Sequence, residues 1–333
     1  MPTPPSWPIA FAAALGTFRQ VLRQVPPSLL SSEPAVRTFL QPVANNIGWP
    51  SLILPSGVSV APGLVQGVRG EWLLPGGRLE APSKAKPAKR LLFWAHGGGF
   101  VFCSPGTHRR FLARVADCAD IPVFCADYRK PPSHPFPVPG NDVLDAYLAL
   151  RREACAERLF LGGDSAGGNL ALAVTRALLQ TQGDSAPVSS MPAPRRPPEG
   201  LVLLSPWADL SDAGESESWR SNAEIDYIPA RQAEVVAGLY ANGTSLEDVR
   251  LSPGRSREWP RGFPRVLLDY GGGEAFRSQI ERLVAALVEA GVDVDASAEA
   301  GMVHGYPFFD FLWGSGPGPF DAYFRRVAAF LHS

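Results

Sequence analysis

Short apolar runs alternate with longer amphipathic segments along the chain from about residue 65 onward. Continuous apolar runs are typical of strands buried on both faces, whereas apolar residues repeating every three or four positions predict helices. The predicted strands are Leu91–Ala95, Pro122–Ala126, Arg158–Leu161, Leu201–Leu204, Arg265–Leu268 and Val292–Asp295. The predicted helices are Thr107–Asp117, Asn141–Cys155, Ala166–Gln180, Arg277–Ala290 and Phe320–Leu331. This alternation predicts an α/β fold with a mostly parallel, doubly wound sheet.

Three segments depart from this alternation. The first 50 residues are predicted to be helical, from the spacing of Phe11 and Leu15 and from a second short pattern over Ala35–Leu40. Residues 208–250 form a long insertion between two predicted strands, with a helical pattern near Ala230–Tyr240. Insertions of this length usually cover a site. The proline-rich segment 181–199 predicts a flexible surface loop.

The composition is that of one large globular domain. The chain has 333 residues, of which 45% are hydrophobic and 19% charged, so it can bury a sizeable core. The chain has 31 Lys and Arg residues and 32 Asp and Glu residues, so its net charge is −1. Nothing in this balance favours nucleic acid or an anionic membrane as the main partner. The oligomeric state stays open.

Cysteine spacing and the N-terminal apolar run bear on the cellular setting. Cys103, Cys118, Cys125 and Cys155 show no CxxC spacing and no pairing with histidines, which disfavours a zinc site or a disulfide framework. The apolar run Ile9–Leu15 is too short to span a bilayer, and no basic stretch precedes it. We expect a soluble, cytoplasmic protein that needs neither a metal nor an organic cofactor.

The strongest chemical signal is the G-x-S-x-G motif at residues 163–167, centred on Ser165. It follows a predicted strand and precedes a predicted helix, which is the context that a nucleophile elbow requires. Small residues two positions before and after the serine let the backbone pass through the sharp turn. Ser165 is therefore the predicted nucleophile.

A run of three glycines follows His96 directly after another predicted strand. Peptide N–H groups without side chains can approach a ligand closely, as an oxyanion hole requires. We expect the donors to be the N–H groups of Gly98, Gly99 and Ala166, the residue after the nucleophile. Gly97 either adds a further donor or only shapes the loop. His96 belongs to this loop and is expected to brace it.

The general base must come from the remaining histidines. His332 is near the end of the sequence, and His108 and His134 lie before Ser165. The chain order expected for this kind of sheet enzyme is serine, then acid, then histidine. His304 follows the last predicted strand after a short connection, and it is the predicted base with an ordinary pKa near 6.5.

Together these motifs resemble those of the hormone-sensitive-lipase branch of the α/β-hydrolases, serine esterases marked by HGGG and GDSAGG. The resemblance covers roughly residues 90–330 and includes a DYR segment at 127–129, an SPWADLS segment at 205–211 and an LSP segment at 251–253. It implies an α/β-hydrolase fold with a helical cap, and an acyl-enzyme mechanism. The DYR segment lacks the acidic residue that usually follows it in the family.

The acid of the triad is the least certain residue, because two carboxylates compete. The family places its acid three residues after a glycine that ends a strand, and the step from Gly271 to Glu274 reproduces this. The resemblance therefore implies Glu274, a glutamate variant similar to that of some fungal natural-product hydrolases and a hint of secondary metabolism. Asp269 is the alternative, but it is expected to lie within the preceding strand or at its edge.

The resemblance also implies how the substrate is enclosed. We expect a single hydrolase domain over 1–333, capped by elements from about 1–50 and 208–250, and a small or medium apolar carboxylic ester as the substrate. Three alternatives stay open: an amidase or formamidase, a deacetylase of a natural-product intermediate, and a receptor that reuses the fold without turnover. The predicted substrate contacts are Phe100, Trp207, Trp219 and Tyr240.

Overall fold

The structure is a computed structural model, and it describes residues 7–46, 54–55, 57–153, 155–180, 195–313 and 318–333. In this part of the chain, eight strands form one sheet in the order β1-β2-β4-β3-β5-β6-β7-β8. The strands are β1 (Ser59–Val65), β2 (Val68–Leu74), β3 (Ala88–Ala95), β4 (Val123–Asp127), β5 (Ala156–Asp164), β6 (Leu201–Leu204), β7 (Val266–Gly271) and β8 (Val294–Glu299). From β4 to β8 all neighbours pair in parallel, as the buried apolar runs predict.

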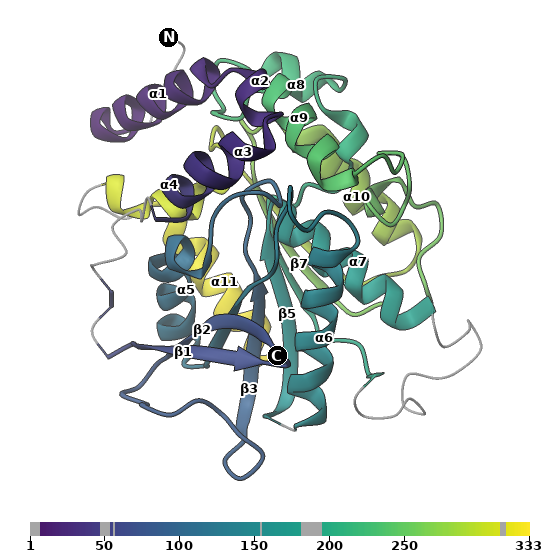
Figure 1. Cartoon of the computed structure of the whole chain (residues 1–333). Coiled ribbons are helices and arrows are strands. Elements are labelled where there is room, and N and C mark those ends of the chain that lie inside the picture. The colour runs from purple at the N-terminus through teal and green to yellow at the C-terminus, as the bar shows by residue number, and fades with distance from the viewer. Residues whose placement is uncertain (1–6, 47–53, 56, 154, 181–194, 314–317) are drawn as a thin grey trace.

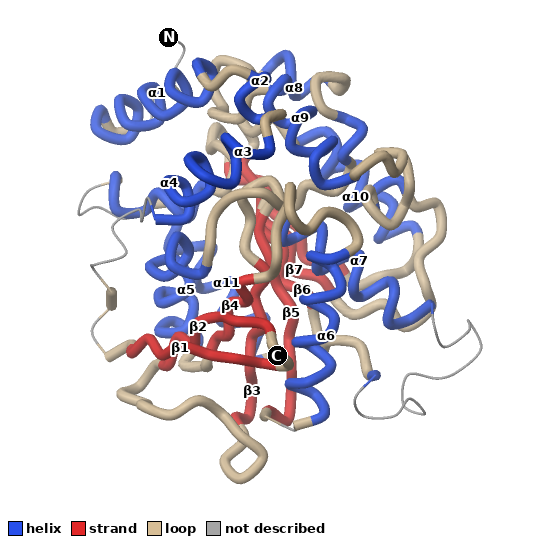
Figure 2. Tube along the Cα trace, in the orientation of Figure 1, coloured by secondary structure: helices blue, strands red, loops and turns tan. Residues whose placement is uncertain are grey.

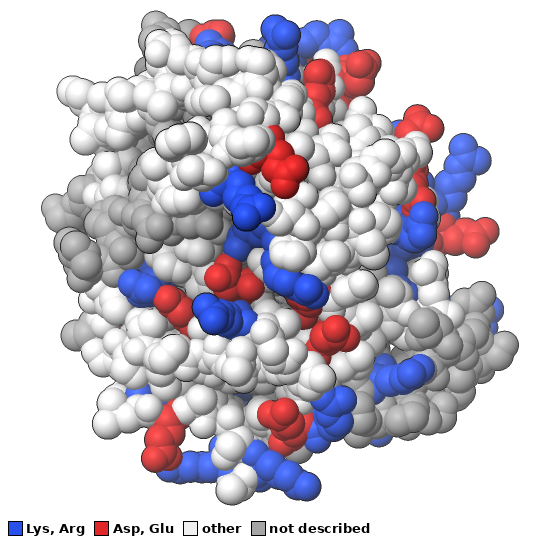
Figure 3. Space-filling model, viewed as in Figure 1, with Lys and Arg blue, Asp and Glu red and all other residues white. Residues whose placement is uncertain are grey.

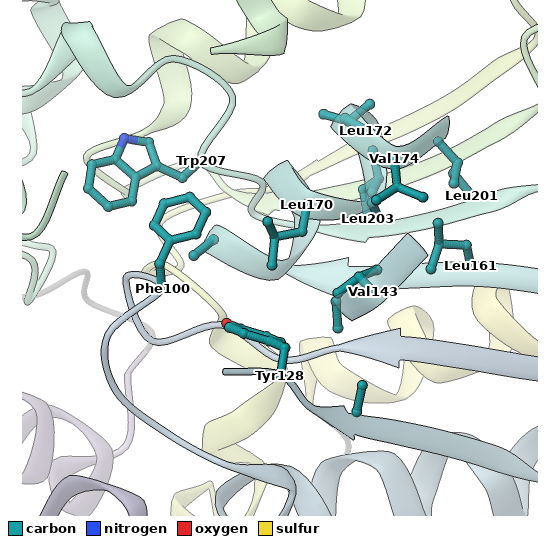
Figure 4. Packing of buried hydrophobic residues seen from close by; sticks show 14 of the residues in the cluster. Phe100, Tyr128, Val143, Leu161, Leu170, Leu172, Val174, Leu201, Leu203 and Trp207 are labelled. Atoms are coloured by element: carbon teal, nitrogen blue, oxygen red, sulfur yellow. The ribbon is translucent and has the colours of Figure 1, made fainter. Parts of the chain in front are cut away.

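Helices cover both faces of the sheet (Figures 1 and 2). One face carries α5 (Pro105–Ala119) and α11 (Pro319–His332), and the other carries α6 (Val138–Arg152), α7 (Ala166–Gln180) and α10 (Arg277–Glu289). Successive side chains of a strand point to opposite faces, so each strand supplies two cores. Leu201 and Leu203 of β6 pack in the core beneath α6 and α7, as Figure 4 shows, whereas Val202 and Leu204 pack in the other. The predicted doubly wound α/β architecture is confirmed.

A group of helices lies over the end of the sheet at which the parallel strands finish (Figure 1). From the N-terminal segment come α1 (Ile9–Gln24), α2 (Pro27–Leu30), α3 (Glu33–Ala35), the π-helical turn Val36–Leu40 and α4 (Gln41–Asn46). From the insertion come α8 (Glu217–Ser221) and α9 (Ala230–Ala241). Gln232 of α9 donates to the carbonyl oxygens of Leu22 and Val25 at the end of α1, at 3.3 and 3.1 Å. Both segments expected to form a cap therefore meet at one end of the molecule.

The antiparallel hairpin of β1 and β2 is absent from the sequence prediction. Pro62 and Gly63 interrupt β1, and Gly70 interrupts β2, so neither segment shows a strand pattern. The structure explains Gly70, because a side chain there would clash with the ring of Phe124 and the carbonyl oxygen of Cys125 on β4. Close packing against a strand distant in sequence thus replaces the local signal.

The proline-rich segment, the surface charge and the helix lengths can each be compared with the sequence predictions. Of the proline-rich segment 181–199, residues 181–194 lie outside the described part, while Tyr147 and Arg151 of α6 bond to the carbonyl oxygens of Arg196 and Pro197 at 2.7 and 2.9 Å. Acidic and basic side chains intermingle on the face shown in Figure 3. None of the described helices combines the length and the apolar character needed to cross a bilayer.

Candidate active site

Ser165 lies at the turn between β5 and α7. Its φ of 52° is in the left-handed region, a strained conformation for a serine that is found at functional turns. A side chain at Gly163 or Gly167 would clash with the facing backbone, so the motif's glycines are required by close packing. The backbone N–H of Ser165 donates to the carbonyl oxygen of Leu204 on the neighbouring strand at 2.9 Å. The local sequence thus forces the serine into the geometry of a nucleophile elbow.

The glycine loop lies beside this turn. Gly98 and Gly99 have φ values of 102° and 62°, conformations that glycine adopts at little cost. The N–H of Gly97 donates to Oδ1 of Asp164 at 3.1 Å, so it shapes the loop. For the N–H groups of Gly98, Gly99 and Ala166, no described residue acts as acceptor. Their assignment as the oxyanion hole stays a prediction.

Two buried histidines hold the glycine loop in place. His108 contacts Oδ2 of Asp164 through Nε2 at 3.1 Å, and the same carboxylate accepts from the indole N–H of Trp94 at 2.9 Å. His96 contacts the carbonyl oxygen of Gly97 through Nδ1 at 2.7 Å and stacks on Tyr128 with ring centroids 4.4 Å apart. Burial lowers the pKa of His96 well below its ordinary value. His96 thus contacts the loop itself, and His108 contacts the carboxylate that accepts from the N–H of Gly97.

His304 lies in the loop after β8 and pairs with a carboxylate. Its Nδ1 is 3.3 Å from Oε1 of Glu274, and the side chains of both residues are buried. Burial alone would lower the pKa of His304, but the hydrogen bond and charge of Glu274, with the charges of Asp226 and Asp164, raise it above its ordinary value. The expectation of an unperturbed pKa is therefore wrong, because three buried carboxylates favour the imidazolium.

The two competing carboxylates have different partners. Oε2 of Glu274 accepts hydrogen bonds from Oγ of Ser205 at 2.6 Å and from the N–H of Gly271 at 2.7 Å, which leaves Oε1 for His304. Asp269 lies within β7, as expected, and both of its oxygens are 2.7 Å from Nη1 of Arg326 on α11. Of these two carboxylates, Glu274 is the one that the structure pairs with His304.

Ser165 Oγ and His304 Nε2 are not hydrogen-bonded to each other in the described chain. Such a bond often forms only when substrate tightens the site, so its absence does not argue against the pair. Ser165 follows β5 and His304 follows β8, and the strands from β5 to β8 run parallel, so both residues lie at the end of the sheet where these strands finish.

The four predicted substrate contacts belong to a buried aromatic cluster. Phe100 stacks on Tyr240 of α9 with ring centroids 3.8 Å apart. Phe100 also lies beside Trp207, as Figure 4 shows. Trp207 stacks on Phe276, whose ring also contacts Trp219 edge-on at 5.3 Å. Packing between the sheet and the insertion accounts for their burial, and contact with a substrate stays a prediction.

Three side chains that the sequence reasoning gave no role lie around Glu274 and His304. Ser205 donates to Glu274 and accepts from the N–H of Gly305 at 3.1 Å. Asn222 and Asp226, in the turn after α8, bond to the backbone of the two loops that carry Glu274 and His304. Ser205 stands in the SPW segment and could have been found there, whereas nothing local marks the other two. No group of His, Cys, Asp and Glu in the described residues is arranged to hold a metal ion.

Comparison with known proteins places this geometry in a family. Residues 92–308 match the family described as alpha/beta hydrolase fold. An acetyl-hydrolase from Streptomyces hygroscopicus is 31% identical over 235 residues, which are 70% of this chain and 71% of that protein. The esterase LipU from Mycobacterium tuberculosis is 30% identical over 262 residues, 77% of this chain and 80% of that protein. A crystal structure of an esterase from the bacterial hormone-sensitive lipase family is similar with a TM-score of 0.77 and 27% identity, covering 99% of this chain and 98% of that one.

The chain therefore belongs to the α/β-hydrolases, in the branch of hormone-sensitive-lipase-like esterases. The resemblance drawn from the HGGG and GDSAGG motifs is confirmed.

Proposed function

We propose that the protein is a serine esterase that cleaves a carboxylic ester of a small or medium apolar substrate through an acyl-enzyme. The observation that carries this proposal is the hydrogen-bonded pair of His304 and Glu274, found at the same sheet edge as the strained Ser165 turn. A histidine held by a buried carboxylate is what a serine nucleophile needs as its base.

In the first half of the proposed reaction, Ser165 Oγ attacks the acyl carbonyl carbon while Nε2 of His304 takes the hydroxyl proton. Glu274 accepts from Nδ1–H and stabilises the imidazolium that forms. The N–H groups of Gly98, Gly99 and Ala166 stabilise the oxyanion, with each donor worth about 3 kcal/mol. The tetrahedral intermediate collapses when His304 donates its proton to the leaving alkoxide.

In the second half, water attacks the acyl-enzyme. His304 takes a proton from the water, the C–O bond to Ser165 breaks, and the serine recovers its proton from the imidazolium. The products are one alcohol and one carboxylic acid per ester. No step requires a metal or an organic cofactor.

The relative from Streptomyces hygroscopicus named an acetyl-hydrolase makes acetyl esters the first acyl group to test, and it favours deacetylation as the second candidate function. The same residues could cleave an amide, so amides belong in the comparison. A receptor without turnover would have no use for the paired His304 and Glu274. The proposal includes a single domain capped by about 1–50 and 208–250, and a cytoplasmic location.

The test compares wild type with Ser165→Ala on aryl esters of increasing acyl length and on matched amides. Wild type should hydrolyse esters faster than amides and should react with a fluorophosphonate probe, whereas the variant should do neither. An unchanged melting temperature in Ser165→Ala shows that the fold is intact. Turnover that persists in the purified variant would overturn the mechanism.

A further inference from the structure

The turn that follows α8 places a buried carboxylate against the candidate active site. Asp226 is 2% exposed. Its Oδ1 accepts hydrogen bonds from the backbone N–H groups of His304 at 3.1 Å and Tyr227 at 2.9 Å. Its Oδ2 accepts from the N–H of Ala275 at 2.7 Å. One side chain from the insertion therefore binds three backbone donors, two of which belong to the loops of the acid and the base.

The bonds to Ala275 and His304 join the loop after β7 to the loop after β8. They add to a direct backbone hydrogen bond between these loops, from the N–H of Gly273 to the carbonyl oxygen of Met302 at 2.8 Å. Ala275 directly follows Glu274, so fixing its N–H fixes the backbone from which the acid extends. Asn222, at the start of the same turn, donates from Nδ2 to the carbonyl oxygen of Glu274 at 2.8 Å. The turn therefore binds both polar groups of the single peptide unit that joins Glu274 to Ala275.

We infer that Asp226 is a positioning residue of the triad, which sets the backbones of the acid and base loops so that His304 Nδ1 meets Glu274. The inference rests on the proposed serine mechanism and adds to it a residue of the insertion. Ser205 makes the equivalent link from the end of β6, because it bonds both Glu274 and the N–H of Gly305. The pair of His304 and Glu274 is thus held from the sheet and from the insertion together.

An isosteric amide cannot replace this carboxylate. Asparagine offers one acceptor oxygen, so its NH₂ group would face either the N–H of Ala275 or those of Tyr227 and His304. The loops would then shift apart. Misplacing a catalytic group by about 1 Å can cost on the order of 100-fold in rate. Because the Asp226 side chain is buried against backbone, the loss should fall on kcat and leave KM nearly unchanged.

The charge of Asp226 provides a second readout. The charged groups that face His304 are Glu274, Asp226 and Asp164, and all three raise its pKa. Removing the charge of Asp226 should lower the pKa of His304, so the acidic limb of the kcat/KM profile should move to lower pH. Burial raises the pKa of Asp226 itself to about 6, and His304 and Glu274 are the charged groups that face it. The kcat values are therefore compared at about pH 8, where the wild-type carboxylate is ionised.

The experiment uses Asp226→Asn in the full chain. We expect kcat to fall 10- to 100-fold with KM within about twofold, and the acidic limb to move to lower pH. An NMR titration of the His304 ring in the Ser165→Ala background, with the signal assigned by His304→Gln, measures the same pKa shift without a substrate. Asp212→Asn is the matched control, because Asp212 is a buried carboxylate of the same insertion that pairs with Arg282 at 3.0 Å. It should leave both kcat and the His304 titration unchanged.

The outcomes separate this inference from the proposed function. If wild type hydrolyses esters through Ser165, yet Asp226→Asn keeps wild-type kcat and an unshifted His304 titration, the inference is overturned and the function stands. If no ester is hydrolysed, the NMR titration still decides it. Should Asp226→Asn fail to fold, Asn222→Ala removes the neighbouring bond to Glu274. A kcat loss with unchanged KM in that variant supports positioning by this turn, and an unchanged kcat overturns it.

Discussion

Replacing Glu274 by glutamine changes one atom in the acid's side chain, and the hydrogen bonds around it dictate the outcome. Gly271 N–H and Ser205 Oγ both donate to Oε2, so the single carbonyl oxygen of glutamine is required at that position. Its NH₂ group must then point at Nδ1 of His304, where Oε1 now lies at 3.3 Å. Nδ1 becomes the acceptor and the proton moves to Nε2. In this tautomer the imidazole cannot take the proton of Ser165.

The expected loss can be given a magnitude. The equivalent aspartate-to-asparagine change in serine proteases lowers kcat by about 10⁴-fold through the wrong tautomer. We expect Glu274→Gln to lower kcat by about 10³- to 10⁴-fold, which corresponds to about 4–5.5 kcal/mol of transition-state stabilisation. The loss in folding stability should be smaller, on the order of 1.5–3 kcal/mol for one hydrogen bond to a charged group, because both bonds to Oε2 survive.

The assay is kcat on an aryl ester, alongside the melting temperature. Asp269→Asn is the matched control, because it also changes one buried carboxylate to an amide on the same chain segment. That variant removes the ion pair between Asp269 and Nη1 of Arg326. It should lower the melting temperature, while kcat stays within a few-fold of wild type. Near-normal kcat in Glu274→Gln beside an inactive but folded Asp269→Asn would show that Asp269 is the acid and that the tautomer argument is misplaced.

Two further predictions concern the base and the glycine loop. Because the pKa of His304 is raised, kcat/KM should rise with pH through an apparent pKa above the ordinary 6.5. His304→Ala should remove both the activity and this pH dependence, whereas His108→Ala should retain the pH dependence. An inactive His108→Ala beside an active His304→Ala would reverse the assignment of the base. In Gly97→Ala, the new methyl group would clash with the Asp164 carboxylate, so the loop must move and kcat should fall about 100- to 1,000-fold, as on loss of one oxyanion donor. Wild-type kcat in that variant would show that the position of this loop does not control catalysis.

The parts of the site that could be predicted from sequence are those whose geometry is fixed locally. Ser165 sits in a strand–turn–helix whose small residues are neighbours in sequence, and its positive φ follows from that turn. The same holds for Gly98 and Gly99, which lie within four residues of the end of β3. His304 followed from chain order, although its raised pKa depends on carboxylates that only the fold brings to it.

What could not be predicted depends on contacts between distant segments. Asp226 bonds to N–H groups 49 and 78 positions further along the chain, and backbone donors leave no mark in a sequence. The β1–β2 hairpin was missed for a related reason, since Gly63 and Gly70 are required by the aromatic ring of Phe124 rather than by a local turn. In both places, contacts between distant segments determine which residue is required, and the hydrophobic pattern of the sequence does not reveal these contacts.

The order of the three proposed catalytic residues along the chain has a consequence for how the protein matures. Ser165 follows β5, Glu274 follows β7, and His304 follows β8 at the edge of the sheet. During synthesis the nucleophile therefore leaves the ribosome well before its base, and domains of this size gain native packing late. On the proposed mechanism, a nascent or partly refolded chain can already have most of its helices and strands and still be unable to hydrolyse an ester. Recovery of activity reports the docking of the final strand, so it should lag behind the recovery of secondary structure measured by circular dichroism.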